Sequence, residues 1–132
     1  MKARIILIFI LVLASCSAMT PEDNCETKVL ERIYFGTDTP DGPVSEKDWQ
    51  AFLKTFITRK FPNGLTVFKG SGQWLGNNQV IVKEPSYVVE LIHEDRLLER
   101  ESIEFIIENY KTQFKQEAVL DTRSNIEACL KR

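Results

Sequence analysis

The alternation of apolar and polar residues predicts one helix in the first half of the chain. Apolar side chains recur from Trp49 to Ile57 at the i, i+3, i+4, i+7 spacing that places them on one face of a helix. Ser45 precedes this pattern, and its hydroxyl can accept a hydrogen bond from the amide of Asp48. We expect the helix to stop at residues 61–64 (Phe-Pro-Asn-Gly), because proline and glycine interrupt helical pairing.

A second helix is predicted over residues 96–114. Apolar residues from Ile103 to the end of this segment follow helical spacing. Asp95 immediately precedes the segment and can cap its N-terminus. Leu98 and Phe105 lie nearly opposite the apolar stripe, where they form either a small exposed patch or isolated surface residues.

Four other segments have the composition and alternation of β-strands. Gly36 ends the first of them, and Gly70 and Gly72 weaken the second. Pro85 in the third implies a bulge or an unpaired edge position. The predicted strands cover residues 28–35, 65–74, 80–92 and 118–123.

The predicted order is strand, helix, strand, strand, helix, strand, which is the split βαβ or ferredoxin-like arrangement. Right-handed crossovers place the first and third strands side by side in the middle of a four-stranded antiparallel sheet. Both helices then cover one face of the sheet. The sequence therefore predicts an α+β domain whose second sheet face is open.

The first residues have the pattern of an export signal. Lys2 and Arg4 precede an uninterrupted apolar run over residues 5–13. At about 1.5 Å per residue, this run spans less than half of a bilayer core, so it fits a signal peptide and not a transmembrane helix. The Leu-Ala-Ser-Cys sequence of residues 13–16 resembles the lipobox of bacterial lipoproteins. The alternative is an ordinary secretory signal followed by a coincidental cysteine.

The lipobox resemblance implies cleavage after Ser15, a diacylglycerol on the Cys16 sulfur, and acylation of the new amino group. Several acyl chains anchor a protein stably to a membrane, so we expect this chain in the cell envelope. Ser17 and not aspartate follows Cys16, which in a Gram-negative cell resembles lipoproteins forwarded to the outer membrane. The resemblance therefore implies the outer membrane, facing the periplasm. The predicted organisation is a signal peptide over 1–15, a lipid-anchored tether over 16–25 and a single domain over 26–132.

The composition narrows the classes of function. The 132 residues include 17 Lys and Arg against 19 Asp and Glu, a formal net charge of −2. This balance excludes the strongly basic footprint of a nucleic-acid-binding protein, and the length suits a single domain. We expect no cofactor and no metal site, because His93 is the only histidine and no Cys-x-x-Cys pair occurs.

Cys25 and Cys129 lie near the two ends of the predicted domain. An exported protein meets an oxidising compartment, in which paired cysteines are common. A disulfide bond between them would close a loop of about a hundred residues and contribute on the order of 4 kcal/mol in the chain-entropy model. The alternative is two unpaired thiols in frayed ends.

The only cluster with general acid–base character is residues 93–95 (His-Glu-Asp). We favour a plainer interpretation, in which a histidine at a strand end is followed by acids that stabilise a helix start. The sequence shows no Ser-His-Asp or Cys-His arrangement and no glycine-rich phosphate loop followed by a helix. Catalysis is therefore not the expected function.

Polar and aromatic side chains are predicted to gather on the open sheet face, where Arg32 and Tyr34 join Glu90 of the adjacent strand. Such a group suits a small-ligand pocket or a protein interface. The alternative is hairpin packing together with a surface ion pair that contributes roughly 0–1 kcal/mol. The candidate ligand or partner site comprises Arg32, Tyr34, Gln73, Trp74, Glu84 and Glu90.

Several short sequences together resemble one bacterial family, the domain of unknown function 3574. They include residues 32–36 (Arg-Ile-Tyr-Phe-Gly), 44–46 (Val-Ser-Glu) and 61–67 (Phe-Pro-Asn-Gly-Leu-Thr-Val), with further matches at 72–74, 84–86 and within 110–120. The resemblance covers roughly residues 27–123 and implies a small exported protein or lipoprotein. The family has no established activity, so it transfers no catalytic residues.

We therefore expect a lipid-anchored envelope domain that binds a ligand or a partner without catalysis. A homodimer formed across the open sheet face is one such arrangement. The second hypothesis is an enzyme with its site in a dimeric, barrel-like cavity beneath Tyr34, Arg32, Trp74 and Glu84. The third is a structural envelope protein. A solvent-shielded pocket lined by Arg32, Tyr34 and Glu90 would favour the ligand or enzyme hypotheses.

Overall fold

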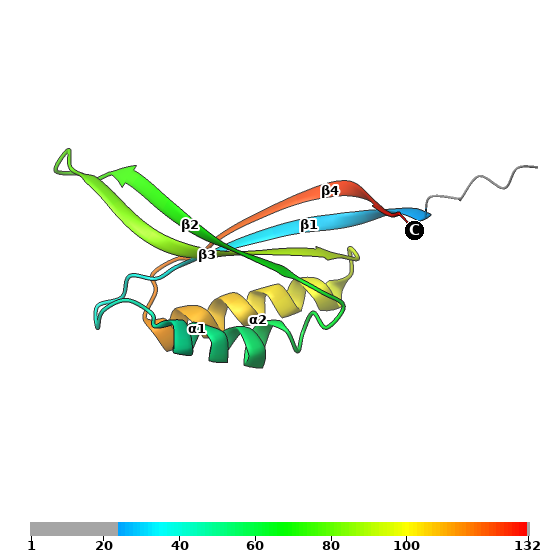
Figure 1. Cartoon of the computed structure of the whole chain (residues 1–132), viewed down its shortest axis with the longest axis horizontal. Helices are drawn as coiled ribbons and strands as arrows, with labels where there is room; N and C mark the ends of the chain where they lie inside the picture. Colours follow the sequence, from blue (N-terminus) through cyan, green and yellow to red (C-terminus); the bar gives the residue numbers. More distant parts are fainter. Residues whose placement is uncertain (1–23, 132) are drawn as a thin grey trace, which may run out of the picture.

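The computed structural model describes residues 24–131, which fold into one sheet and the helices that cover it (Figure 1). The elements follow one another as β1 (Asn24–Gly36), α1 (Glu46–Phe52), the π-helical turn η1 (Leu53–Ile57), β2 (Thr66–Leu75), β3 (Ile81–His93), α2 (Leu97–Phe114) and β4 (Leu120–Leu130).

The four strands form one antiparallel sheet in the order β2-β3-β1-β4. Helices α1 and α2 lie on the same side of this sheet, below it in Figure 1, and leave the other face open. The predicted α+β fold is therefore confirmed. The strand order, with β1 and β3 in the centre, is compatible with the ferredoxin-like arrangement.

The core lies between the helices and the covered face of the sheet. Trp49 of α1 is fully buried and stacks on Tyr87 of β3, with ring centroids 4.2 Å apart. The hydroxyl of buried Tyr110 on α2 donates to the carbonyl of Gly36 at 2.8 Å and so ties α2 to the end of β1. Large aromatic side chains supply much of the buried surface. The core cluster comprises Ile33, Phe35, Trp49, Phe52, Ile57, Phe61, Tyr87, Val89, Leu91, Ile103, Ile106 and Tyr110.

The two helix starts differ in how far local sequence determines them. At α1, Ser45 Oγ accepts a hydrogen bond from the amide of Asp48 at 3.1 Å, as predicted. The prediction that Asp95 caps α2 is wrong, because the N-cap residue is Arg96 and makes no side-chain cap hydrogen bond. The Asp95 carboxylate instead pairs with Arg123 of β4 at 2.5 Å. Asp95 thus pairs with Arg123, which is distant in sequence, and does not form the predicted local cap of α2.

Strands β1 and β4 both extend further than the alternation predicted. They begin and end at Asn24 and Leu130, which lie opposite each other in register. One position inward, a disulfide bond joins Cys25 to Cys129 across the same two strands. The mostly polar sequence of residues 124–127 concealed this extension, because β4 is an edge strand and is largely exposed there.

The hairpin of β2 and β3 extends past the helices at one end of the molecule (Figure 1). Pro85 lies opposite Ser71 of β2, one position beyond the last pairing of β3 with β1, which is Gly36 with Ser86. The carbonyl of Pro85 accepts a hydrogen bond from the amide of Thr37 at 3.1 Å. The position of the N–H that Pro85 lacks faces the side on which β1 has already ended. No strand there needs this donor, so the position tolerates proline as an edge position does.

Candidate functional site

Three predicted site residues meet on the open face of the two central strands. Arg32 of β1 lies opposite Glu90 of β3, and its Nε donates to Glu90 Oε2 at 2.7 Å. This hydrogen bond and the charge of Glu90 raise the pKa of the Arg32 guanidinium above its ordinary value. Tyr34 is half-buried on the same face. Arg32 is exposed, so these side chains form part of a surface and not a solvent-shielded pocket.

Beside this ion pair, a row of apolar and aromatic side chains crosses all four strands. Phe68 of β2 lies opposite Val88 of β3, and Val88 lies opposite Tyr34 of β1. Tyr34 in turn lies opposite Leu120 of β4. We call these four residues the apolar row. Its end members, Phe68 and Leu120, are 49% and 60% exposed.

Phe68 and Leu120 were not among the predicted site residues. Each is an apolar residue in a strand, and from sequence such a residue is indistinguishable from a core residue. Only the strand register shows that both share a face with Tyr34.

Trp74 and Glu84 are brought together elsewhere on the open face, towards the end of the hairpin. They line a cavity of about 570 Å³ whose other walls include residues 38–40 and 115–118. Glu84 Oε1 accepts a hydrogen bond from the amide of Asp38 at 3.1 Å, which fixes the carboxylate beside the loop after β1. The cavity therefore lies between the β2–β3 hairpin, the loop after β1 and the loop after α2.

Gln73, the sixth predicted residue, is separated from this cavity. It lies opposite Lys83, whereas its neighbour Trp74 lies opposite Val82. Successive residues of a strand point to opposite faces, so Gln73 and Trp74 occupy different sides of the hairpin. The strict alternation of the strand could have shown this from sequence.

His93 is held by hydrogen bonds at both ring nitrogens. Its Nδ1 donates to the carbonyl of Glu94 at 2.7 Å, and its Nε2 lies 3.2 Å from Glu31 Oε2. The side chains of His93 and Glu31 are both buried. Because neither ring nitrogen is available to a ligand, the geometry favours a structural role for the acid–base cluster over a catalytic one.

Asp121 of the edge strand joins this buried pair. Partial burial, and then hydrogen bonding to Glu31, raise the pKa of the Asp121 carboxyl to about 7. The charges of Glu31 and of Glu104 on α2 act in the same direction. Glu31 therefore links titratable groups of β3 and β4. It was missed because it is a carboxylate buried on the face whose neighbours Ile33 and Phe35 mark it as apolar core.

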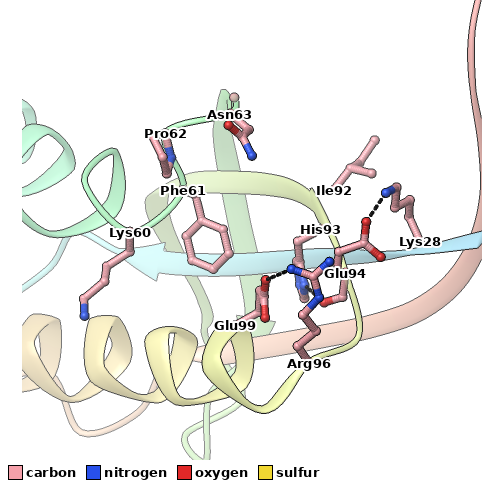
Figure 2. Close-up of a pocket in the computed structure, with 11 residues that line it drawn as sticks. Lys28, Lys60, Phe61, Pro62, Asn63, Ile92, His93, Glu94, Arg96 and Glu99 are labelled. Atoms are coloured by element: carbon pink, nitrogen blue, oxygen red, sulfur yellow. Dashed lines mark hydrogen bonds and ion pairs between the residues drawn. The ribbon is translucent and has the colours of Figure 1, made fainter.

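A cavity of about 370 Å³ lies beside His93 (Figure 2). Its Lys28 forms an ion pair with Glu94, and Arg96 Nη1 lies 3.9 Å from Glu99 Oε1. The second carboxylate oxygen of Glu99 is buried and has no partner in the described part of the chain. Two of the cations in this cavity thus pair with its two carboxylates, and the third, Lys60, lies over the ring of Phe105.

The two described cysteines do not supply metal ligands. The Cys25 and Cys129 sulfurs lie near a carboxylate oxygen of Glu127, a grouping that could hold a metal ion if the thiols were free. They are joined in a disulfide bond instead, and a metal-binding cysteine is a thiolate. The exposed carboxylate of Glu127 would by itself bind a metal ion only weakly.

Cys16, the predicted lipidation site, lies outside the described residues, as do the predicted signal peptide and most of the tether. Within residues 24–131, no helix combines the length and the apolar composition needed to cross a membrane.

Comparison with protein families gives a match over nearly the whole described domain. The profile described as "Protein of unknown function (DUF3574)" matches residues 30–130. The chain belongs to the DUF3574 family. The match confirms the family that the short sequences resembled, and it reaches beyond residue 123 to include Cys129. No curated protein matches this DUF3574 chain.

Two solved structures of a phage SAM lyase share the fold of this DUF3574 protein. The structure in complex with S-methyl-5′-thioadenosine is 16% identical, with a TM-score of 0.54 over 78% of this chain and 90% of that chain. The apo structure is 18% identical, with a TM-score of 0.54 over 80% and 90%. At these identities the likeness is one of fold.

Proposed function

We propose that this chain is a lipid-anchored binding domain of the cell envelope that associates with a second copy through its open sheet face. The observation that carries the proposal is the apolar row, which crosses the whole sheet and ends in two large exposed side chains, Phe68 and Leu120. A contiguous exposed apolar surface of this kind is typical of an interaction site. Two sheets pack well face to face when each presents such side chains.

The charges of the open face support a second copy as the partner. Arg32 and Glu90 pair with each other beside the apolar row. Lys28 is likewise paired with Glu26, which lies two residues before it and on the same face. Beside the apolar row, a surface whose charges are paired in this way does not repel an identical surface. A strongly charged partner would gain little from such a surface.

The lipid anchor rests on the Leu-Ala-Ser-Cys sequence of residues 13–16. We expect mass spectrometry of the membrane-extracted protein to find an N-terminal Cys16 that carries diacylglycerol and an N-acyl chain. The Cys16→Ser variant should remain uncleaved, since only a thiol forms the thioether. An unmodified chain in the cytosol, or normal processing of Cys16→Ser, would reject the anchor.

The self-association is tested on the full chain, solubilised from membranes in a mild detergent. Light scattering should give a protein mass of two chains for the unmodified sequence, and Leu120→Asp should shift it towards one. Leu98→Asp is the matched control, because Leu98 on α2 is 68% exposed and Leu120 is 60% exposed. A monomeric unmodified protein, or equal effects of the two variants, would reject the proposed interface.

A second candidate function is an enzyme that acts on S-adenosylmethionine. The observation that favours it is the shared fold with a phage SAM lyase, one structure of which holds S-methyl-5′-thioadenosine. This protein also has a cavity of about 570 Å³, a size that suits such a ligand. Incubation with S-adenosylmethionine, followed by chromatography for S-methyl-5′-thioadenosine, tests it directly. Product that Glu84→Gln abolishes supports the enzyme, and no product above the buffer background rejects it.

A further inference from the structure

We propose that the cavity between Trp74 and Glu84 is a binding site for a small organic cation. The inference deepens the second candidate function, on which it rests for its choice of probes, and it requires no catalysis. It also requires no second copy of the chain, because every wall of the cavity comes from one chain.

The first argument is the charge of the cavity wall. Asp38, Glu84 and Glu117 all line it, against a single lysine, Lys115. The Nζ of Lys115 pairs with Asp41 outside the cavity at 2.6 Å. The cavity thus carries an excess of carboxylates whose charges are not neutralised within it, and a cleft lined by one sign of charge concentrates the opposite ion.

The second argument is Trp74, which gives the site an aromatic surface independent of the carboxylates. Its side chain remains 50% exposed and lines the cavity next to Val82. The face of an indole ring is the best aromatic partner for a cation, and it favours diffuse cations such as sulfonium or quaternary ammonium groups. An apolar body around the positive centre would also contact Val82.

The third argument is that Glu84 is in position before a ligand binds. A β-carbon built on Gly36 would overlap Glu84 Oε1, so the glycine leaves the space that the carboxylate occupies. The same oxygen accepts the hydrogen bond of the Asp38 amide. A carboxylate fixed in advance loses less conformational entropy on binding. The cavity volume of about 570 Å³ lies within the usual range for small-molecule sites.

The cavity beside His93 does not share these properties. Its cations are Lys28, Lys60 and Arg96, and its carboxylates are those of Glu94 and Glu99. An organic cation therefore fits the Trp74 cavity and not the cavity of Figure 2.

The experiment compares two probes that differ in charge at one atom. S-Adenosylmethionine carries a sulfonium centre, and S-adenosylhomocysteine is the corresponding neutral thioether. Calorimetric titration of the detergent-solubilised full chain should give tighter binding of the sulfonium by about tenfold or more. Trp74→Ala and Glu84→Gln should each weaken sulfonium binding by roughly three- to thirtyfold and should affect the thioether less.

The controls keep the result interpretable. Gln73→Ala, on the opposite side of the hairpin from Trp74, should leave binding unchanged. Gly36→Ala should weaken binding because it displaces the Glu84 carboxylate. Circular dichroism of each variant shows whether the fold is retained. Equal binding of the two probes, no binding of either, or insensitivity to both Trp74→Ala and Glu84→Gln would overturn the proposal.

The outcomes separate this proposal from the other two. Light scattering on the same samples reports self-association, so a monomer that binds the sulfonium rejects only the proposed dimer. Sulfonium binding without conversion to product rejects only the enzyme. A dimer that binds neither probe rejects the cation site and the enzyme, but not the proposed dimer. Product formation that neither Trp74→Ala nor Glu84→Gln affects rejects the cation site but not the enzyme.

Discussion

Arg32 of β1 and Glu90 of β3 form an ion pair across the two central strands, with Arg32 Nε 2.7 Å from Glu90 Oε2. The pair continues outwards through Thr66 on β2 and Thr122 on β4, which lie opposite Glu90 and Arg32. This polar row runs alongside the apolar row. The open face therefore alternates between an apolar and a polar stripe, and a second sheet packed on it would meet both.

We expect the Arg32–Glu90 pair to matter more for association than for folding. Arg32→Ala should leave the free energy of unfolding almost unchanged, because exposed ion pairs are screened by water. Urea unfolding of the unmodified chain and of Arg32→Ala measures this difference. A large loss of stability in the variant would show that the pair is structurally essential.

The raised pKa of Asp121 makes the stability depend on pH. Its folded value of about 7 lies above the ordinary 3.8, so its neutral form stabilises the fold at acid pH. That contribution is complete below the unfolded pKa and is lost as the pH rises through the folded one. Solvent screening limits its size, because Asp121 as a whole residue is exposed on the edge strand, although its carboxyl loses part of its hydration beside Glu31.

Asp121→Asn should flatten this part of the pH profile. We expect the free energy of unfolding of the unmodified chain to fall from about pH 5 to about pH 8 by more than that of the variant. Urea unfolding at a series of pH values measures both. Parallel profiles for the two proteins would contradict the pairing of Asp121 with Glu31.

The disulfide bond should contribute strongly to stability. It joins residues 104 positions apart, and a loop of this length corresponds to about 4 to 5 kcal/mol in the chain-entropy model. We expect dithiothreitol to lower the thermal midpoint of the unmodified chain. The double variant Cys25→Ser, Cys129→Ser should have the lowered midpoint already and should not respond to the reductant. If dithiothreitol did not change the thermal midpoint of the unmodified chain, that result would contradict the presence of the disulfide bond.

The two tryptophans should differ sharply in their effect on folding. Trp49 is fully buried against Tyr87, and its replacement by alanine should cost about 3 to 5 kcal/mol. Trp74 is half exposed, and Trp74→Ala should cost less than about 1 kcal/mol. Chemical unfolding of both variants gives the comparison. Similar losses would mean that the hairpin end is part of the core.

Sequence patterns predicted the elements of this fold better than their ends. Helical spacing around Trp49 and the cap at Ser45 act within a few residues, and both are found in the structure. The extension of β4 depends on pairing with the start of β1, which no local pattern reveals. The same holds for Asp95, whose partner Arg123 comes from a different element.

The sequence could place a residue in the candidate site only where it also predicted the strand register. Adjacent central strands sufficed to place Arg32 beside Glu90. The pairing of Glu31 with His93 did not follow in the same way, because Glu31 lies opposite Leu91 and meets His93 only diagonally on the covered face. Phe68 could be assigned to the open face only once the strand order and register were known.

The most direct test of the central claim is photo-crosslinking of the full chain in its native membrane. A photoreactive amino acid replaces Leu120 on the open face in one strain and Leu98 on α2 in another. The account predicts a crosslinked product of two chains from position 120 and little or none from position 98. A two-chain product from position 98 alone, or only single chains from position 120, would contradict association through the open sheet face.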